Sequence, residues 1–173
     1  MSDSPSIYVA CLSSYNNGVL HGAWIDLDIY THEDDVLGAI AEMLAESPAR
    51  DADEWDIHDT QGFHGLDREL CSDIDDYCKL ADVVRDHEPA AMAAYNDCVG
   101  FNSIDSMASS FEEAYQGEYS DEVEFAEQFA EDVDMLGELP EHLKPYFDIE
   151  KYARDLFLDG FFMVNNRYVF ANI

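Results

Sequence analysis

The chain has 173 residues, which is enough for one ordinary domain or for two or three small units. It carries 39 Asp and Glu against 8 Lys and Arg, and this net charge of −31 disfavours direct binding to nucleic acids or anionic membranes, which both require basic side chains. The 47% hydrophobic content, with 2 Trp, 10 Tyr and 10 Phe, excludes a disordered acidic tail.

The first part of the chain is predicted to form a small β-β-α-β unit. Two apolar runs, Ile7–Leu12 and Val19–Leu27, flank Asn17-Gly18, a pair typical of a two-residue type I′ hairpin turn. Thr31 is placed to cap a helix with three acids in its first turn, which suits the positive end of the helix dipole. Apolar and polar residues alternate from Trp55 to Asp59, which predicts a third strand.

The middle of the chain shows helical patterns and no convincing strand. Ser72 is predicted to cap one helix. A second helix is predicted to begin at Pro89 and to end before Gly100, since proline favours the first helical position and glycine the position after the last.

Three helices and a hairpin are predicted for the last part of the chain. Ser110 and Glu113 form a capping box for a short helix. Longer helices are predicted over Asp121–Leu136, which has an apolar stripe and an acidic opposite face, and over Ile149–Asp159.

The hairpin pairs Phe161–Val164 with Arg167–Phe170 around Asn165-Asn166. These elements predict an elongated α+β fold of three small units: a β-β-α-β N-terminal unit at 1–61, an all-helical middle unit at 62–103, and helices plus a β-hairpin at 104–173.

Negative charge is spread over all three predicted units, with net charges of −12, −6 and −13. No Lys or Arg occurs between Arg85 and Lys144, so the acids there forgo the helical ion pairs that ordinary solvated surfaces use. At about one charge per 1.7 Å of duplex, 31 charges match roughly 50 Å of DNA. The predicted acidic surface comprises Glu33, Asp34, Asp35, Glu42, Glu46, Asp73, Asp76, Glu122, Glu124, Glu127, Glu131, Asp132 and Asp134.

No catalytic constellation is found, so the chain is predicted to be a non-enzymatic protein without a metal or cofactor. Phosphate-binding loops, serine nucleophile elbows and zinc-protease motifs are all missing from the sequence. Cys71 and Cys78 lie seven residues apart, a spacing that favours buried core thiols over a zinc site. The sparse cysteines, and the lack of an apolar signal or spanning segment, predict a cytoplasmic location.

Several stretches are similar to the ArdA family of antirestriction proteins, in order along nearly the whole chain. They are Ile7-Tyr-Val-Ala-Cys-Leu, Tyr15-Asn-Asn-Gly, Leu20-His-Gly-Ala-Trp-Ile-Asp26, Trp55-Asp-Ile-His-Asp59 with Gly62-Phe63, Phe111-Glu-Glu-Ala-Tyr-Gln-Gly-Glu-Tyr119, and the segment from Tyr146 to Phe170.

This resemblance implies an elongated homodimer that mimics bent duplex DNA. It would occupy the DNA-binding groove of type I restriction-modification enzymes and protect mobile genetic elements from cleavage and often from methylation. Carried over from the family, the dimer contact would lie near Phe111, Ala114, Tyr115 and Tyr119, for which packing inside the unit is nearly as good an interpretation.

Three other interpretations remain open from the sequence. The acidity could serve solubility alone in a salt-adapted protein, clustered carboxylates could bind metal in a hydrolase that lacks any known motif, or the mimicry could be directed at another DNA-binding protein. Repulsion between crowded carboxylates is further expected to raise their pKa values in the folded state.

Overall fold

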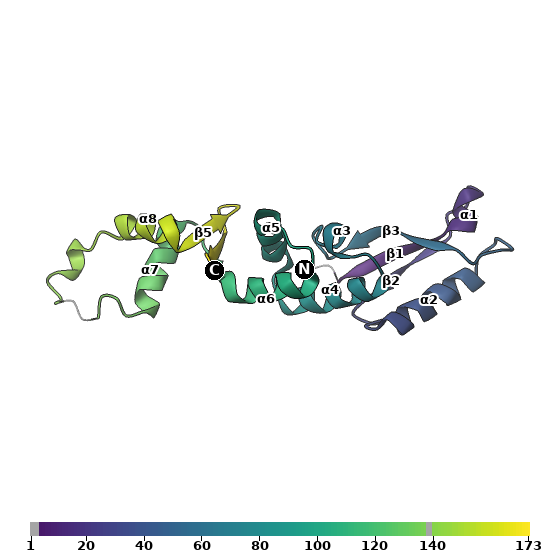
Figure 1. The fold of residues 1–173 in the computed structure, drawn as a ribbon, viewed down its shortest axis with the longest axis horizontal. Helices are drawn as coiled ribbons and strands as arrows, with labels where there is room; N and C mark the ends of the chain where they lie inside the picture. Colours follow the sequence, from purple (N-terminus) through teal and green to yellow (C-terminus); the bar gives the residue numbers. More distant parts are fainter. Residues whose placement is uncertain (1–3, 138–139) are drawn as a thin grey trace. The chain divides into compact units, whose positions relative to one another are not determined.

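The computed structural model describes residues 4–137 and 140–173, and the chain divides into two compact units, 1–108 and 109–173 (Figure 1). The described residues contain eight α-helices, one short 3-10 helix and six strands, which confirms the predicted α+β class. The boundary between the units falls within α6 (Ile104–Ala114). The finer division at 61 and 103 stays a prediction.

The first unit is built on an antiparallel sheet with strand order β2-β1-β3, formed by β1 (Ser6–Cys11), β2 (Gly22–Asp26) and β3 (Trp55–Gln61). Helix α2 (Glu33–Ala45) packs along one face of this sheet (Figure 1). Its Val36 and Ile40 are buried together with Ile7, Val9 and Ile25 of the strands, and together they form the core of the predicted β-β-α-β arrangement.

The connection between β1 and β2 differs from the predicted two-residue turn. Helix α1 (Leu12–Asn16) follows β1 directly, and the first strand therefore ends before Leu12. Asn17 has a negative φ of −91°, so a type I′ turn, which needs two positive φ angles, does not form. Only Gly18 adopts the left-handed region, at φ 75°.

Three helices complete the described first unit: α3 (Asp67–Leu70), α4 (Ile74–Asp86) and α5 (Pro89–Val99). Pro89 at the start and Gly100 at the end of α5 are as predicted, and Gly100 has φ 76°. Two predicted caps are displaced by one residue, because His32 rather than Thr31 precedes α2 and Asp73 rather than Ser72 caps α4.

The second unit contains a sheet of strand order β4-β6-β5 and two packed helices, α7 (Glu122–Asp132) and α8 (Ile149–Asp159). The hairpin of β5 (Phe161–Val164) and β6 (Tyr168–Ala171) is confirmed. Phe125 of α7 packs against Phe161 with ring centroids 4.8 Å apart, which joins helix and sheet in one aromatic core.

Three predictions for this part of the chain were wrong in detail. Helix α6 begins at Ile104, so Ser110 lies inside the helix and not at its N-terminus. Helix α7 ends at Asp132, followed by turns, and does not extend to Leu136. Strand β4 (Tyr115–Glu118) was not predicted, and it pairs with β6. A 3-10 helix, η1 (Lys144–Tyr146), lies between α7 and α8.

Candidate protein-binding surface

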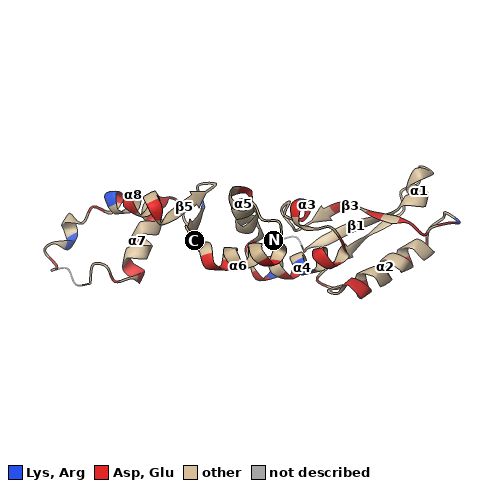
Figure 2. Cartoon of the chain, viewed as in Figure 1, with Lys and Arg blue, Asp and Glu red and all other residues tan. Residues whose placement is uncertain are grey.

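Nearly all acidic side chains are exposed in the part of the chain that the structure describes. The exceptions are Asp67, which is buried, and Asp26, Asp75 and Asp76, which are partly buried. Figure 2 shows Asp and Glu on elements of both units, with few Lys and Arg. The thirteen predicted surface acids therefore all lie at the surface, with only Asp76 partly withdrawn.

Helix α2 presents five of these acids because its apolar stripe fixes its orientation on the sheet. Val36, Ile40 and Met43 are buried, so the acidic positions on the other side of the helix face solvent. The exposed acids are Glu33, Asp34 and Asp35 in the first turn, Glu42 on the last turns, and Glu46 at the C-cap.

Two carboxylates at the start of α4 are held by a reciprocal cap. Asp73 Oδ1 accepts a hydrogen bond from Asp76 N over 3.0 Å. Asp76 Oδ2 in turn accepts from the hydroxyl of Ser72 over 2.7 Å and from Ser72 N over 2.9 Å. These bonds to the charged form, first the one from the hydroxyl, lower the pKa of Asp76.

Helix α7 carries the densest group of predicted acids. Asp121 caps it by accepting hydrogen bonds from Val123 N and Glu124 N, each over 2.9 Å. Phe125, Ala126 and Ala130 are buried, and five acids on the remaining positions are exposed: Glu122, Glu124, Glu127, Glu131 and Asp132. Asp134 follows the helix at a positive φ of 49° and is also exposed.

Among the described residues, two carboxylates have a pKa that clearly departs from its ordinary value, and in both the pKa is lowered, not raised by crowding. Hydrogen bonding to Ser120 lowers the pKa of Glu124, as Ser72 lowers that of Asp76. The expectation of raised values is wrong for both residues, because local N–H and O–H donors compensate for neighbouring charge.

Five of the eight basic residues pair with carboxylates outside the predicted set. Arg85 pairs with Asp28 and Asp82, and further pairs join Lys79 to Asp75, Lys144 to Glu141, Arg154 to Asp155 and Arg167 to Glu118. None of the thirteen predicted acids takes part in an ion pair among the described residues. Within the part of the chain that the structure describes, no direct ion pair therefore neutralises their charge.

The predicted dimer contact lies largely inside the second unit. Phe111 and Ala114 are 2% and 0% exposed, and Phe111 stacks on Tyr115 with ring centroids 4.8 Å apart. Tyr119 packs edge-on against Phe125 at 5.0 Å. Only Tyr115 and Tyr119 have partly exposed side chains, so Phe111 and Ala114 offer almost no surface to a partner. Dimerisation itself stays a prediction.

The described residues contain no group of three or more His, Cys, Asp and Glu that could hold a metal ion. Cys71 and Cys78 are free thiols. Burial, with added repulsion from nearby carboxylates, raises the pKa of Cys71 to about 12 and that of Cys78 to about 11. Thiols with such pKa values are poor metal ligands at neutral pH, because metals bind the thiolate. No helix among the described residues has the length and apolar character to cross a membrane.

A comparison with protein families identifies the family to which this acidic chain belongs. The family model described as "Antirestriction protein (ArdA)" matches residues 7–170, which is almost the whole chain. The chain belongs to the ArdA antirestriction family. As an ArdA member it has an antirestriction function, and its family consists of inhibitor proteins rather than enzymes. A comparison with curated proteins gave no match.

The predicted acidic surface of this ArdA chain did not include three carboxylates of the first sheet. Asp26 lies on β2, and Asp56 and Asp59 lie on β3. They surround an aromatic pair of the partly exposed Tyr8 and the exposed Trp24, which sequence reasoning also missed. The predicted two-residue turn at Asn17-Gly18 would have placed Tyr8 opposite Leu27, so no signal in the sequence indicated the Tyr8–Trp24 pairing that the strand register shows.

Proposed function

We propose that the protein inhibits type I restriction-modification enzymes by occupying their DNA-binding groove, with its carboxylates in the places of DNA phosphates. The observation that carries this proposal is the set of thirteen exposed or partly exposed acids, none of them ion-paired among the described residues. Most lie on the helices α2, α4 and α7, which hold them in a fixed pattern. A groove shaped for a polyanion attracts such a surface at long range.

The charge density of α7 supports this mechanism. Its 11 residues span about 16 Å at 1.5 Å per residue. Five exposed acids over that length give one charge per ~3.3 Å, close to the ~3.4 Å of one DNA strand. Helix α7 alone therefore presents a DNA-like linear charge density.

The binding energy is expected to be distributed over many charges. A protein that replaces DNA in this way releases the counterions bound to the enzyme's groove, so inhibition weakens as salt concentration rises. We further propose that the protein acts as a cytoplasmic homodimer, which doubles the charge available to one enzyme. Inhibition of methylation as well as cleavage follows if both reactions use the occupied groove.

A competition assay tests the mechanism. A purified type I restriction-modification enzyme is mixed with labelled target DNA and increasing amounts of the protein, at two salt concentrations. We expect displacement of DNA near stoichiometric amounts, and weaker displacement at the higher salt concentration. Failure to displace DNA from several such enzymes, with the protein folded, would favour another DNA-binding target or a surface that serves solubility alone.

Carboxylate-to-amide variants of α7 separate distributed charge from a discrete site. Glu127→Gln alone should leave inhibition nearly unchanged. Amides at all five positions should weaken inhibition more than tenfold, because several charge contacts with the enzyme are lost together. Far-UV circular dichroism controls for folding. Complete loss of inhibition from the single change would contradict distributed binding and indicate a discrete active site.

A further inference from the structure

The sheet of the first unit has one face that α2 does not cover. Residues directly opposite each other in an antiparallel sheet point to the same face. Trp24 of β2 and Asp59 of β3 both lie opposite Tyr8 of β1, so these three side chains form one row across the sheet. Ile7 and Ile25, one residue along, are buried on the side of α2, which places the row on the opposite face.

The aromatic pair in this row is built into the strands. The Tyr8 and Trp24 rings lie with centroids 5.5 Å apart at an interplanar angle of 54°. Gly22 lies two residues before Trp24, and a Cβ atom there would come within 2.8 Å of the Tyr8 hydroxyl and 2.4 Å of Val9 O. Glycine at this position therefore leaves room for the Tyr8 ring to lie along the sheet. Trp24 remains 49% exposed despite its size.

Carboxylates surround the aromatic pair. Asp59 lies opposite Tyr8, Asp26 is two residues beyond Trp24 on the same face, and Asp56 lies opposite Ala10 in the adjacent row. Asp59 Oδ1 accepts a hydrogen bond from Thr60 N over 2.9 Å, and Asp56 Oδ1 accepts from Ile57 N over 2.9 Å. These bonds orient the two carboxylates, and among the described residues their Oδ2 atoms accept no hydrogen bond.

We propose that this face, formed by Tyr8, Trp24, Asp26, Asp56 and Asp59, is a docking surface for arginine side chains of a basic partner protein. A guanidinium group stacks on aromatic rings and at the same time donates paired hydrogen bonds to carboxylates. A lysine ammonium is a more strongly hydrated point charge and gains less from the rings. Trp, Tyr and Arg are also the residues that most often dominate interface energies.

This inference rests on the proposed function, and it adds a contact that DNA does not make. Imitated phosphates attract any cation in a DNA-binding groove, whereas an aromatic pair flanked by carboxylates selects arginine. A second copy of the chain is a poor occupant of the same face, because each copy carries a net charge of −31 and the face itself is acidic.

A peptide titration tests the arginine preference without any restriction enzyme. The chain has two tryptophans, so Trp55→Phe leaves Trp24 as the only tryptophan reporter. We expect hexa-arginine to change Trp24 fluorescence saturably, with a dissociation constant about 3- to 10-fold below that of hexa-lysine at equal ionic strength. Equal affinity for the two peptides would overturn the proposal.

The reciprocal variant is the matched control. Trp24→Phe keeps an aromatic ring on the docking surface and leaves Trp55, which lies opposite Cys11 on the α2 side of the sheet, as the reporter. Trp55 fluorescence should not respond to hexa-arginine, and a response equal to that of Trp24 would also overturn the proposal. A Trp24 signal that depends on protein concentration without peptide would indicate a second copy as the occupant instead.

The competition assay then separates this inference from the proposed function. Trp24→Ala should weaken inhibition by about 3- to 10-fold at both salt concentrations, because it removes stacking and no charge. Leu20→Ala, at a side chain that is 83% exposed, should leave inhibition unchanged. If the unaltered protein inhibits and Trp24→Ala inhibits equally well, the docking surface is refuted and the mimicry stands. If the unaltered protein does not inhibit, the mimicry fails while the peptide titration still decides the arginine preference.

Discussion

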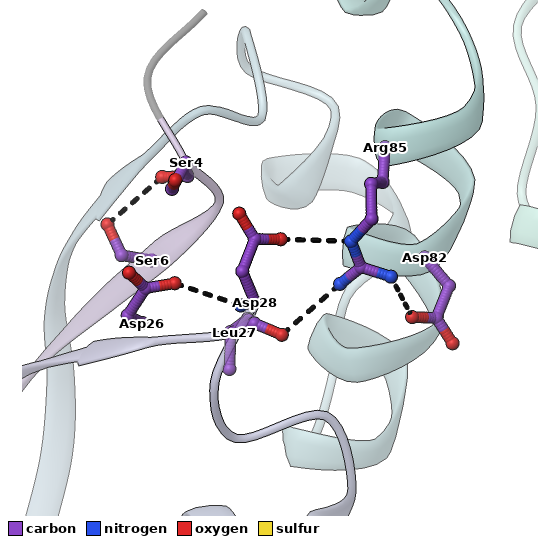
Figure 3. A network of polar contacts seen from close by, with 7 residues as sticks. All are labelled: Ser4, Ser6, Asp26, Leu27, Asp28, Asp82 and Arg85. Atoms are coloured by element: carbon purple, nitrogen blue, oxygen red, sulfur yellow. Dashed lines mark hydrogen bonds and ion pairs between the residues drawn. The ribbon is translucent and has the colours of Figure 1, made fainter.

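Arg85 Nε donates a hydrogen bond to Asp28 Oδ1 over 2.9 Å, and this contact joins residues 57 positions apart in the sequence (Figure 3). The same guanidinium group also donates to Asp82 Oδ1 over 2.6 Å and to the carbonyl of Leu27 over 3.2 Å. One of the eight basic residues of the chain thus ties α4 to the segment that follows β2. In a chain with so few cations, the position of Arg85 between two segments indicates that this residue stabilises the fold.

We expect Arg85→Met to lower the free energy of unfolding by about 1–2 kcal/mol, since it removes two charged contacts and leaves the Leu27 carbonyl without this donor. The 38% exposure of the Arg85 side chain keeps the expected loss at this modest level. Urea denaturation followed by circular dichroism measures it. Arg154→Met is the matched control, because Arg154 is 67% exposed and pairs only with the adjacent Asp155 among the described residues. That control should cost under about 0.5 kcal/mol, and equal losses would refute the structural role of Arg85.

Local patterns in the sequence predicted the elements that depend on nearby residues. Helix α8 has the predicted bounds, and the hairpin at Asn165-Asn166 forms, because capping and turn chemistry act within a few residues. Strand β4 escaped prediction because it is four residues long, contains Gly117 at φ 119°, and gains its stability by pairing with β6, some fifty residues later. Short strands of this kind are fixed by tertiary contacts.

The residues of the candidate surface likewise divide into those that local sequence patterns predicted and those that depend on tertiary contacts. Amphipathic periodicity was enough to place the acids of α2 and α7 on exposed positions. Whether an aromatic residue faces a partner or the core depends on what packs over it, and the sequence left both interpretations open for Phe111. The Tyr8–Trp24 pair needed the strand register, which the wrong turn prediction obscured.

The hydroxyl of Ser72 makes the stability of the protein depend on pH through Asp76. Because the folded-state pKa of Asp76 is lowered, its contribution to stability is present above the ordinary value near 4 and is lost as pH falls through the folded value. Ser72→Ala should therefore cost about 0.5–1 kcal/mol at pH 7 and progressively less towards pH 3. Urea denaturation at several pH values measures this.

Ser106→Ala serves as the control for this pH dependence. The Ser106 hydroxyl donates to the carbonyl of Ser103 over 3.0 Å, a neutral partner that does not titrate in this range. The cost of Ser106→Ala should therefore be the same at pH 7 and pH 3. A Ser72→Ala cost that is likewise constant with pH would show that Asp76 does not gain its lowered pKa from the hydroxyl.

Thiol chemistry should distinguish the four cysteines. Cys98 is exposed, Cys71 is partly buried, and Cys11 and Cys78 are buried. With a pKa of about 12, Cys71 holds roughly one thiolate in ten thousand at pH 8, and only the thiolate reacts. We expect one fast-reacting thiol per folded chain with Ellman's reagent, absent in Cys98→Ser. A second fast thiol that survives in Cys98→Ser and disappears when Cys71→Ser is added would contradict the raised pKa of Cys71.

The turn between β5 and β6 offers a test of backbone strain. Asn165 and Asn166 have φ angles of 55° and 50°, and Arg167 N donates to the carbonyl of Val164 over 3.1 Å to close the turn. Glycine adopts positive φ without steric cost, whereas alanine does not. Asn166→Gly should therefore change the free energy of unfolding by less than about 0.5 kcal/mol, and Asn166→Ala should lower it by about 1 kcal/mol. Thermal denaturation of the two variants gives the comparison. Both substitutions remove the same side-chain amide, so the difference between them does not depend on that amide. Since glycine also raises the entropy of the unfolded chain, which favours alanine, a less stable alanine variant reports strain at positive φ. An alanine variant as stable as the glycine variant or more stable would mean that the turn does not hold Asn166 at positive φ in solution.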